Sequence, residues 1–359
     1  MGLDYSPESR MRESGLNCYA ASMLSQIQTA LDARVSFLSE LEQTDCVRLF
    51  HGVAEGVPGL AIDRYGSVLL LQTWRDPLTH ADVEAIHRCV EDALGDSLIA
   101  VWNHRGSEKG NPREIFPVPE LPARVIGTEH GLRFDVHPRH KTGDPLLFLD
   151  SRVARRRVRE AASGKTVLNL FAYTCSAGVA AIAGGATAAW NVDFARKALD
   201  VGTGNARLND IEVEGDAANP TAWRNIHEDV FPVIRQYAGM RIHDHRGGRK
   251  LRYKSRKPRQ FDVVMLDPPR WSRSAFGAVD VVRDYPTIFK PALLATAPGG
   301  HLLCTNHVAK VSFEDWTDVL HRSAAKAGRP IQTIERLVPD PDVPSFDGNH
   351  PLKMAWIGI

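Results

Sequence analysis

The stretch Phe261-Asp-Val-Val-Met-Leu-Asp267-Pro268-Pro269-Arg270 is an apolar run that ends at an acidic residue followed by two prolines. Proline lacks an amide proton and cannot continue a central strand, so the strand must end at this point. Asp267 is therefore expected at the carboxyl edge of a sheet, with Pro268 and Pro269 beside it. In open α/β sheets this edge is where ligands bind. The stretch predicts an α/β fold with a ligand site at Asp267.

Apolar runs alternate with helical patterns on both sides of this stretch, which is typical of a doubly wound sheet. The predicted strands are 166–171, 188–192, 261–266 and 300–305, and the predicted helices are 176–183, 195–208 and 285–297. Upstream, helical spacing covers 17–42, followed by strands 45–50, 68–74 and 98–102, a helix 81–94, a turn-rich segment 57–66 and a hairpin 124–128 with 132–136. We therefore expect a helical segment 1–44, a small α/β module 45–122 and a larger α/β domain 123–359.

Composition excludes several classes of protein. The chain has 359 residues, of which 43% are hydrophobic and 24% charged, as in ordinary globular proteins. Its apolar runs are too short to span a membrane and its first residues do not resemble a signal peptide, so we expect a cytoplasmic protein without a membrane partner. The five cysteines form no Cys-x-x-Cys pair and have no nearby histidine at metal spacing, so no metal site is expected.

A second set of residues predicts a nucleoside site. The segment 167–178 reads as strand, polar turn and helix, but it is not the Gly-x-Gly-x-x-Gly loop that cradles a pyrophosphate. The next strand ends in Asp193, an acid placed to accept hydrogen bonds from ribose hydroxyls. Asp229 lies where a third strand would end and is placed to accept from an adenine amino group. The candidate ligand residues of the turn itself are Asn169, Phe171, Tyr173, Thr174, Cys175 and Gly178.

With these segments the chain resembles the large-subunit (23S) ribosomal RNA methyltransferases, a family with cytosine-5 enzymes and the guanine-N7 half of a fused guanine methyltransferase. The resemblance covers about residues 45–359. Matching segments are Arg48-Leu-Phe-His-Gly52, Gly59-Leu-Ala-Ile-Asp63-Arg64-Tyr65-Gly66, Leu147-Phe-Leu-Asp150-Ser-Arg152, Asn169-Leu-Phe-Ala-Tyr-Thr174, Asn205-Ala-Arg-Leu-Asn209, the Asp267-Pro-Pro turn and Asp342-Val-Pro-Ser-Phe-Asp-Gly-Asn-His-Pro-Leu-Lys353.

The resemblance implies a Rossmann-like class I methyltransferase domain preceded by a small α/β module that helps to bind RNA. It implies S-adenosyl-L-methionine as the methyl donor and 23S rRNA or a large-subunit precursor as the partner. The turn after the strand 166–171, Asp193, Asp229 and Asp267 would bind the donor, with Asp150 and Arg152 lining the entrance. Cytosine-5 members usually begin with a PUA domain, whereas here a helical segment precedes the shared region.

The resemblance also bears on which base atom is methylated. Cytosine-5 members add a cysteine thiolate to the base, because carbon 5 of cytosine is a poor nucleophile. Their cysteine lies seven residues after the second glycine of a Gly-Gly pair, and here that position is His307. Cys304 lies on the strand itself, where a small buried thiol is expected. Asn306 resembles an asparagine of the guanine-N7 enzyme, so we favour guanine N7, with Asn306 and His307 at the base edge.

One segment has a strong charge bias. Residues 246–259 carry eight Lys or Arg and no acid. They form either a solvated, disordered loop or an arm that binds RNA phosphates with Tyr253 available to stack, and we favour the arm. The candidate RNA-binding residues are Arg246, Arg249, Lys250, Arg252, Lys254, Arg256, Lys257, Arg270 and His307.

Two other classes of protein share parts of this pattern. A nicotinamide-dependent oxidoreductase would also place an acid at Asp193, but it predicts a glycine-rich phosphate turn that this sequence lacks. A non-catalytic RNA-binding or ribosome assembly factor with a methyltransferase fold would account for the missing cysteine nucleophile.

Overall fold

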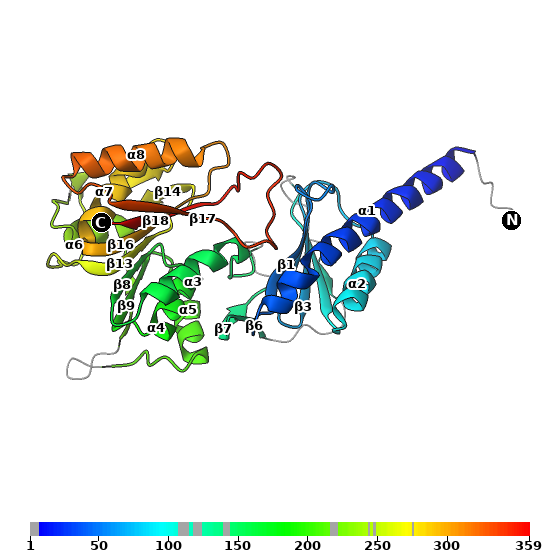
Figure 1. Cartoon of the computed structure of the whole chain (residues 1–359), viewed down its shortest axis with the longest axis horizontal. Helices are drawn as coiled ribbons and strands as arrows, with labels where there is room; N and C mark the ends of the chain where they lie inside the picture. The colour runs from blue at the N-terminus through cyan, green and yellow to red at the C-terminus, as the bar shows by residue number, and fades with distance from the viewer. Residues whose placement is uncertain are drawn as a thin grey trace. The chain divides into compact units, whose positions relative to one another are not determined.

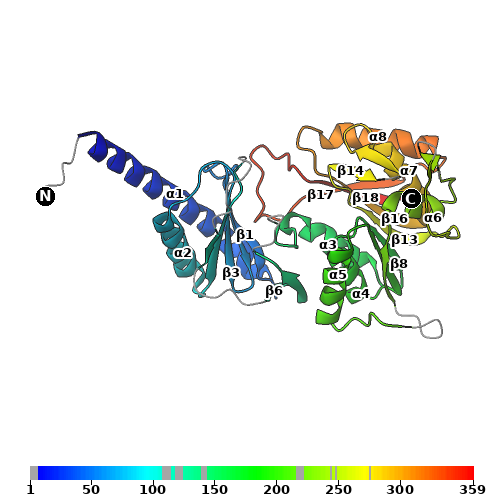
Figure 2. The ribbon, with the colours of Figure 1, turned by 180° about the vertical axis from the view of Figure 1, so that it is seen from behind.

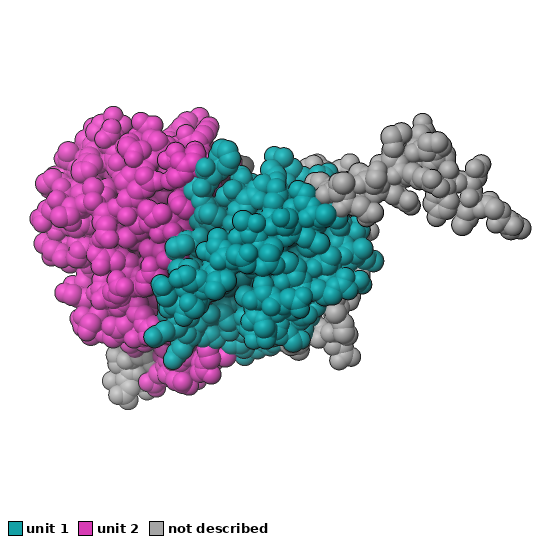
Figure 3. Space-filling model, turned by 45° about the vertical axis from the view of Figure 1, so that its right-hand side comes forward, with its two compact units in different colours: residues 1–131, 135–149, 341–346 teal, residues 132–134, 150–340, 347–359 magenta. Residues whose placement is uncertain are grey.

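The computed structural model describes residues 7–106, 115–117, 124–138, 144–215, 222–242, 245–246, 249–274 and 276–359. The chain divides into two compact units, coloured separately in Figure 3. Unit 1 comprises residues 1–131, 135–149 and 341–346, and unit 2 comprises residues 132–134, 150–340 and 347–359.

Unit 1 is a five-stranded sheet in the order β1-β2-β3-β4-β5, packed against two helices. Its elements are α1 (Pro7–Glu40), β1 (Cys46–His51), β2 (Leu60–Tyr65), β3 (Val68–Thr73), α2 (His80–Leu94), β4 (Ile99–His104) and β5 (Ile115–Pro117). The apolar faces of α1 and α2 supply Ile27 and Ile86 to a core that also contains Leu71 and Trp102. The helical spacing predicted for 17–42 is confirmed as one continuous helix. The hairpin predicted next is confirmed as β6 (Val125–Glu129) and β7 (Leu132–Val136).

The turn-rich segment predicted at 57–66 is wrong in its second half, where the structure has β2. This strand pairs with β1 on one side and with β3 on the other. Its acidic residue Asp63 is buried, and the carboxylate accepts hydrogen bonds from the Arg48 guanidinium at 2.8 and 3.1 Å. Pairing on both edges and this ion pair outweigh the turn preference of the local sequence.

Unit 2 contains a seven-stranded sheet in the order β10-β9-β8-β13-β16-β18-β17. The first five strands are parallel, and β18 is antiparallel to both of its neighbours. The strands are β8 (Thr166–Leu170), β9 (Ala188–Asp193), β10 (Trp223–His227), β13 (Phe261–Leu266), β16 (Thr296–Asn306), β17 (Thr333–Leu337) and β18 (Lys353–Gly358). The predicted α/β Rossmann-like fold is confirmed.

Helices cover both faces of this sheet, as Figures 1 and 2 show. On one face lie α3 (Arg152–Ala161), α4 (Ser176–Ala183) and α5 (Arg196–Leu208), and on the other lie α6 (Val230–Tyr237), α7 (Tyr285–Ala295) and α8 (Phe313–Lys326). The first face is packed through small residues such as Ala154 and Ala181, and the second through larger ones such as Phe289 and Trp316. No helix in the described part of the chain is long and apolar enough to cross a bilayer.

Candidate active site

The carboxyl edge of the sheet in unit 2 gathers the predicted site residues. Strands β8 and β13 are neighbours, with Leu170 paired to Leu266 at their ends. From β8 the chain continues outward to β9 and β10, whereas β13 is followed by β16 on the other side. The strand order therefore reverses between β8 and β13, and a crevice outside such a reversal is the usual ligand site of an α/β sheet. The turn that begins after β8 and the turn at Asp267 border this point.

The turn after β8 has an unusual backbone. Phe171, Tyr173 and Cys175 have φ angles of +57°, +48° and +57°, a left-handed region that residues other than glycine rarely adopt. The turn is held from β9, because the Tyr173 amide donates to Asp193 at 2.9 Å and the Ala172 amide donates to the Val192 carbonyl at 3.0 Å. Contacts with the neighbouring strand therefore fix the conformation that a glycine-rich loop would adopt freely.

Asp193 is the acid that the sequence predicts for the ribose. One carboxylate oxygen binds the Tyr173 amide and the other accepts from the Ala195 amide at 2.7 Å. Burial raises the pKa of Asp193, against the opposing effect of these backbone hydrogen bonds and of His227. The next residue, Phe194, is 62% exposed although it is a large apolar side chain. An acid for hydroxyls beside an exposed ring suits an adenosine group, so the residues present fit the predicted donor.

Other predicted residues of this turn support its packing. The Asn169 amide donates to Asn191 at 3.0 Å, and a Cβ atom at Gly178 would lie 2.2 Å from the Asn191 oxygen. Gly178 is thus required for close packing of α4 on β9. The Thr174 carbonyl accepts from the Asn205 amide at 3.0 Å, which ties the turn to α5. Direct contacts of these residues with a donor stay predictions.

Asp229 begins α6 rather than ending a strand. Its carboxylate accepts a hydrogen bond from the Phe231 amide at 2.9 Å and so caps the helix. The preceding strand, β10, ends two residues earlier at His227 and is parallel to β9. Asp229 therefore lies at the same sheet edge as Asp193, and its contact with an adenine amino group stays a prediction.

Asp267 forms the centre of a polar cluster. Its carboxylate oxygen Oδ1 accepts from the Thr305 hydroxyl and lies 2.8 Å from Nε2 of His307. Burial alone would raise the pKa of Asp267, but His307, Thr305 and Arg155 together outweigh burial and lower that pKa. Burial tends to lower the pKa of His307, yet Asp267 and Asp150 outweigh both burial and Lys353, so the pKa of His307 is raised. The two residues therefore form an ion pair.

This pair predicts a pH-dependent contribution to folding stability. The raised pKa of His307 means that its contribution is complete below the unfolded value of about 6.5 and is lost as pH rises through the folded value. The lowered pKa of Asp267 means that its contribution is present above about 3.9 and is lost as pH falls through the folded value. In urea unfolding we expect a larger stability difference between the wild type and His307→Gln at about pH 6 than at about pH 9. Equal differences at both pH values would argue against the ion pair.

Asn306 and Lys353 lie side by side at the end of the sheet, paired across β16 and β18. The Asn306 side chain is 1% exposed, and its oxygen accepts from the Val308 amide at 2.9 Å. Its amide nitrogen, which can only donate, has no partner among the described residues. The Lys353 ammonium donates to the carbonyls of Val308 and Pro351 at 2.7 and 2.8 Å. This buried donor at the sheet edge is therefore available to an acceptor from a water molecule or a ligand.

Asp150 and Arg152, predicted to line the entrance, differ in exposure. Asp150 lies in the short helix η1 (Leu149–Ser151), is partly exposed, and acts on the pKa of His307 through its charge. Arg152 is fully buried, and its guanidinium pairs with Asp340 at 3.2 Å. Within unit 2 this pair joins the start of α3 to the chain after β17. A contact of Arg152 with the donor stays a prediction.

The basic segment is partly fixed to the domain. The Arg256 guanidinium pairs with Glu228 at 2.5 Å, while its backbone amide donates to Gln236 at 2.6 Å. Arg252, Lys254, Lys257 and Arg270 are exposed. The side chains of Arg246, Arg249 and Lys250 lie outside the described part of the structure. Within the described ranges, no three His, Cys, Asp or Glu side chains gather as metal ligands would.

Sequence reasoning missed several residues of this edge. Thr305 precedes His307 by two positions, so strand alternation places both on one face and could have indicated a shared partner. Phe194 follows a predicted ligand residue, but exposure of its ring is visible only in the structure. Arg155 and Lys353 are buried cations, which no apolar pattern indicates.

Comparisons with known proteins agree with this fold. A family model described as S-adenosylmethionine-dependent methyltransferase matches residues 47–217. Among solved structures, SMU.776 complexed with SAH has a TM-score of 0.75 at 22% identity, covering 95% of this chain and 82% of that one. The SAM-dependent methyltransferase from Agrobacterium tumefaciens has a TM-score of 0.55 at 18% identity, covering 84% and 87% of the two chains. The fold and the family model together define a Rossmann-like methyltransferase that uses S-adenosylmethionine.

The curated relatives are more specific. Ribosomal RNA large subunit methyltransferase I of Aeromonas hydrophila is 31% identical over 318 residues, which is 86% of this chain and 71% of the relative. The protein of the same name from Klebsiella pneumoniae is 29% identical over 348 residues, covering 92% and 79%. The chain belongs to the family of S-adenosylmethionine-dependent ribosomal RNA large-subunit methyltransferases.

Proposed function

We propose that this protein transfers the methyl group of S-adenosylmethionine to a base of 23S rRNA, and that guanine N7 is the acceptor atom. The observation that favours guanine N7 over cytosine C5 is the burial of Cys304. This thiol is fully buried on β16, and burial raises its pKa far above the usual value. The reactive form of cysteine is the thiolate, so Cys304 is unsuited to add to a cytosine ring.

The cluster at Asp267 suits an acceptor that is already nucleophilic. Guanine N7 has an in-plane lone pair and loses no proton on methylation, so the protein needs only to align it with the methyl group. The buried Asn306 amide nitrogen is a donor that lacks a partner among the described residues. Guanine presents the acceptor O6 next to N7, whereas adenine presents an amino group there. A donor at Asn306 therefore favours guanine over adenine, with Pro268 and Pro269 shaping the slot.

Unit 1 is proposed to contribute to RNA binding. Trp74, directly after β3, is 41% exposed, and the Arg105 guanidinium lies 5.6 Å from its ring centroid. Arg105 directly follows β4, the parallel neighbour of β3, so both lie at the same end of that sheet. Exposed aromatic rings and arginines are the groups on which unpaired RNA bases stack. A ribosomal RNA substrate supports a cytoplasmic location for the proposed activity.

Nucleoside mapping of 23S rRNA tests the proposal. In cells that lack the gene we expect one 7-methylguanosine to disappear, and both the wild-type gene and Cys304→Ala to restore it. Cys304→Ala removes a single buried sulfur, so its effect should be confined to a stability loss of about 1–2 kcal/mol. Mass spectrometry of digested rRNA measures the modification. Loss of 5-methylcytidine instead, restored by the wild type and not by Cys304→Ala, would contradict the proposal.

A further inference from the structure

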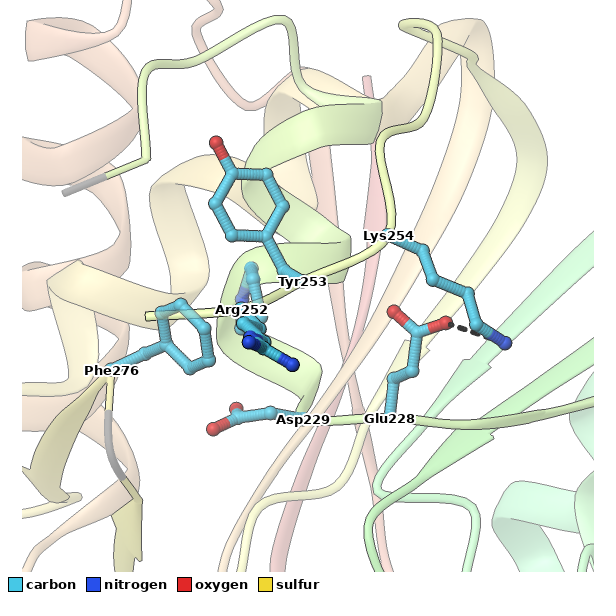
Figure 4. A pocket seen from close by; sticks show the side chains of 7 residues that line it. Glu228, Asp229, Arg252, Tyr253, Lys254 and Phe276 are labelled. Atoms are coloured by element: carbon cyan, nitrogen blue, oxygen red, sulfur yellow. Dashed lines mark ion pairs between the residues drawn. The ribbon is translucent and has the colours of Figure 1, made fainter. Parts of the chain in front are cut away.

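The structure contains a pocket whose lining shares one predicted donor residue, Asp229, with the proposed reaction. It has a volume of about 420 Å³ and is lined by Glu228, Asp229, Pro232, Arg252, Tyr253, Lys254 and Phe276. Figure 4 shows these side chains arriving from three segments: the start of α6, the basic segment before β13, and the loop that carries Phe276. The volume lies in the range of small-molecule sites. Its lining combines aromatic rings, cations and carboxylates, which is the chemistry that recognises a nucleotide.

The aromatic part of the pocket suits a base. Tyr253 is 39% exposed although its ring is large, and it packs edge to face against Phe276 with 6.1 Å between ring centroids. Each ring restrains the other, so a base that stacks on Tyr253 would meet a surface that is already ordered. Stacking on aromatic side chains is tolerant of base identity, because every base presents a π face.

The charged part of the pocket suits a phosphate. Arg252 forms no ion pair with any described residue, and in Figure 4 its side chain lies between Phe276 and Glu228. Lys254 is 3.8 Å from Glu228, which is also paired to Arg256 at 2.5 Å. Glu228 thus serves two cations, whereas Arg252, which shares the lining with Asp229, forms no ion pair with a described residue. The only anionic group of S-adenosylmethionine is its carboxylate, whereas RNA has a phosphate at every nucleotide, so these cations favour RNA over the methyl donor.

The segment that supplies Arg252, Tyr253 and Lys254 is anchored. The Gln236 side chain of α6 donates to the Lys254 carbonyl at 3.1 Å and accepts from the Arg256 amide at 2.6 Å. The Arg256 ion pair with Glu228 adds a third contact, and only 14% of the Arg256 side chain is exposed. The pocket wall is therefore held in place before any ligand arrives, which reduces the entropy lost on binding.

We propose that this pocket binds one nucleotide of the RNA substrate outside the methylated base, with its base against Tyr253 and Phe276 and its phosphate on Arg252 and Lys254. The inference rests on the proposed function for the identity of the RNA. Asp229 lines the pocket and is also the carboxylate predicted to contact the donor adenine, so the nucleotide would bind next to the donor. An RNA bound here lies at the same sheet edge as Asp193 and Asp267.

Filter binding of transcribed 23S rRNA and calorimetric titration of S-adenosylmethionine test the pocket on the full-length protein. We expect Tyr253→Ala to weaken RNA binding about tenfold and Tyr253→Phe to leave it unchanged, because only the former removes the stacking ring. We expect Arg252→Glu to weaken RNA binding and to reduce its dependence on salt concentration. Donor affinity should stay unchanged in all three. Lys326→Glu in the last turn of α8, at the opposite edge of the sheet, is the matched charge control and should bind RNA normally.

Each departure from this pattern has a definite meaning. Unchanged RNA affinity in Tyr253→Ala, with circular dichroism showing a folded protein, would overturn the pocket assignment while the methylation assay of the wild type still tests the proposed function. Loss of donor affinity with normal RNA affinity would assign the pocket to the donor adenosine and overturn the inference. Wild-type protein that binds rRNA through Tyr253 but methylates none would refute the proposed function and support the pocket.

Discussion

Replacing Asp267 by alanine is expected to lower the rate of methyl transfer to rRNA by about 100-fold or more, because small misplacements of an acceptor cost rates of that order. The carboxylate accepts from the Thr305 hydroxyl and binds His307 at 2.8 Å, so it fixes two residues of the neighbouring strand end. Its removal frees the imidazole and leaves the turn between Leu266 and Pro268 without its anchor. Single-turnover incorporation of a labelled methyl group into 23S rRNA measures the effect.

Asp262→Ala is the matched control for this experiment. Asp262 lies near the start of the same strand, β13, and its carboxylate accepts from the Thr166 amide and hydroxyl, both at 2.8 Å. The Asp262→Ala variant therefore loses a comparable hydrogen-bonded carboxylate at the opposite edge of the sheet. We expect lower stability but a normal rate per folded molecule. Near-normal turnover in Asp267→Ala would refute the role of that residue.

Replacing Asp193 by alanine should weaken binding of S-adenosylmethionine by about 100-fold, which corresponds to two hydrogen bonds to a charged group. The variant loses the acceptor for ribose hydroxyls and also the two backbone contacts, with Tyr173 and Ala195, that hold the turn after β8. Calorimetric titration of the donor measures the loss. Because burial raises the pKa of Asp193, we also expect donor binding by the wild type to weaken as pH falls toward that value.

NAD serves as the comparison ligand for the Asp193 variant. An oxidoreductase would bind NAD through the same acid, whereas a methyltransferase would not bind it measurably in either form. Phe194→Ala offers a second comparison, since it removes an exposed ring and no backbone contact. Tight NAD binding by the wild type, abolished in Asp193→Ala, would revive the oxidoreductase interpretation. Unchanged donor affinity in Asp193→Ala would refute the ribose contact.

The parallel part of the sheet follows from sequence because each strand is apolar and ends at a polar turn. The last elements do not follow in the same way. Strand β18 is fully buried yet begins with Lys353, and α3 is a helix whose buried face includes Arg152 and Arg155. Buried cations break the apolar periodicity on which helix and strand predictions depend. Only the partners of these cations, such as Asp340 for Arg152, explain why the charged side chains are buried.

The division of the chain into its two units could not be predicted from the sequence either. Residues 341–346 belong to unit 1, although they follow the 191 residues from Asp150 to Asp340, which belong to unit 2. Hydrogen bonds with residues of unit 1 explain this assignment. Asp342 is fully buried, its carboxylate accepts from the Arg48 amide at 3.0 Å, and its carbonyl accepts from the Arg34 guanidinium at 3.2 Å. Pairs separated by hundreds of positions leave no trace in a local pattern.

The candidate site was predictable where chemistry and strand ends coincide. Asp193 and Asp267 each follow or end a recognisable strand, so their shared edge could be inferred. Strand alternation could have placed Thr305 and His307 on one face, but it does not identify Asp267 of another strand as their shared partner. His307 is exposed, and its contact with a base stays a prediction.

The left-handed residues of the turn after β8 indicate that this part of the predicted donor site forms during folding, before the donor binds. Each such residue other than glycine raises the energy of the backbone by about 1 kcal/mol or more, and Phe171, Tyr173 and Cys175 all adopt this form. The hydrogen bonds of this turn with β9, which form when the domain folds, offset that energy. The turn therefore has its conformation before the donor binds. We therefore expect free and donor-bound protein to share one conformation of this turn, in which case a preformed turn would select the donor.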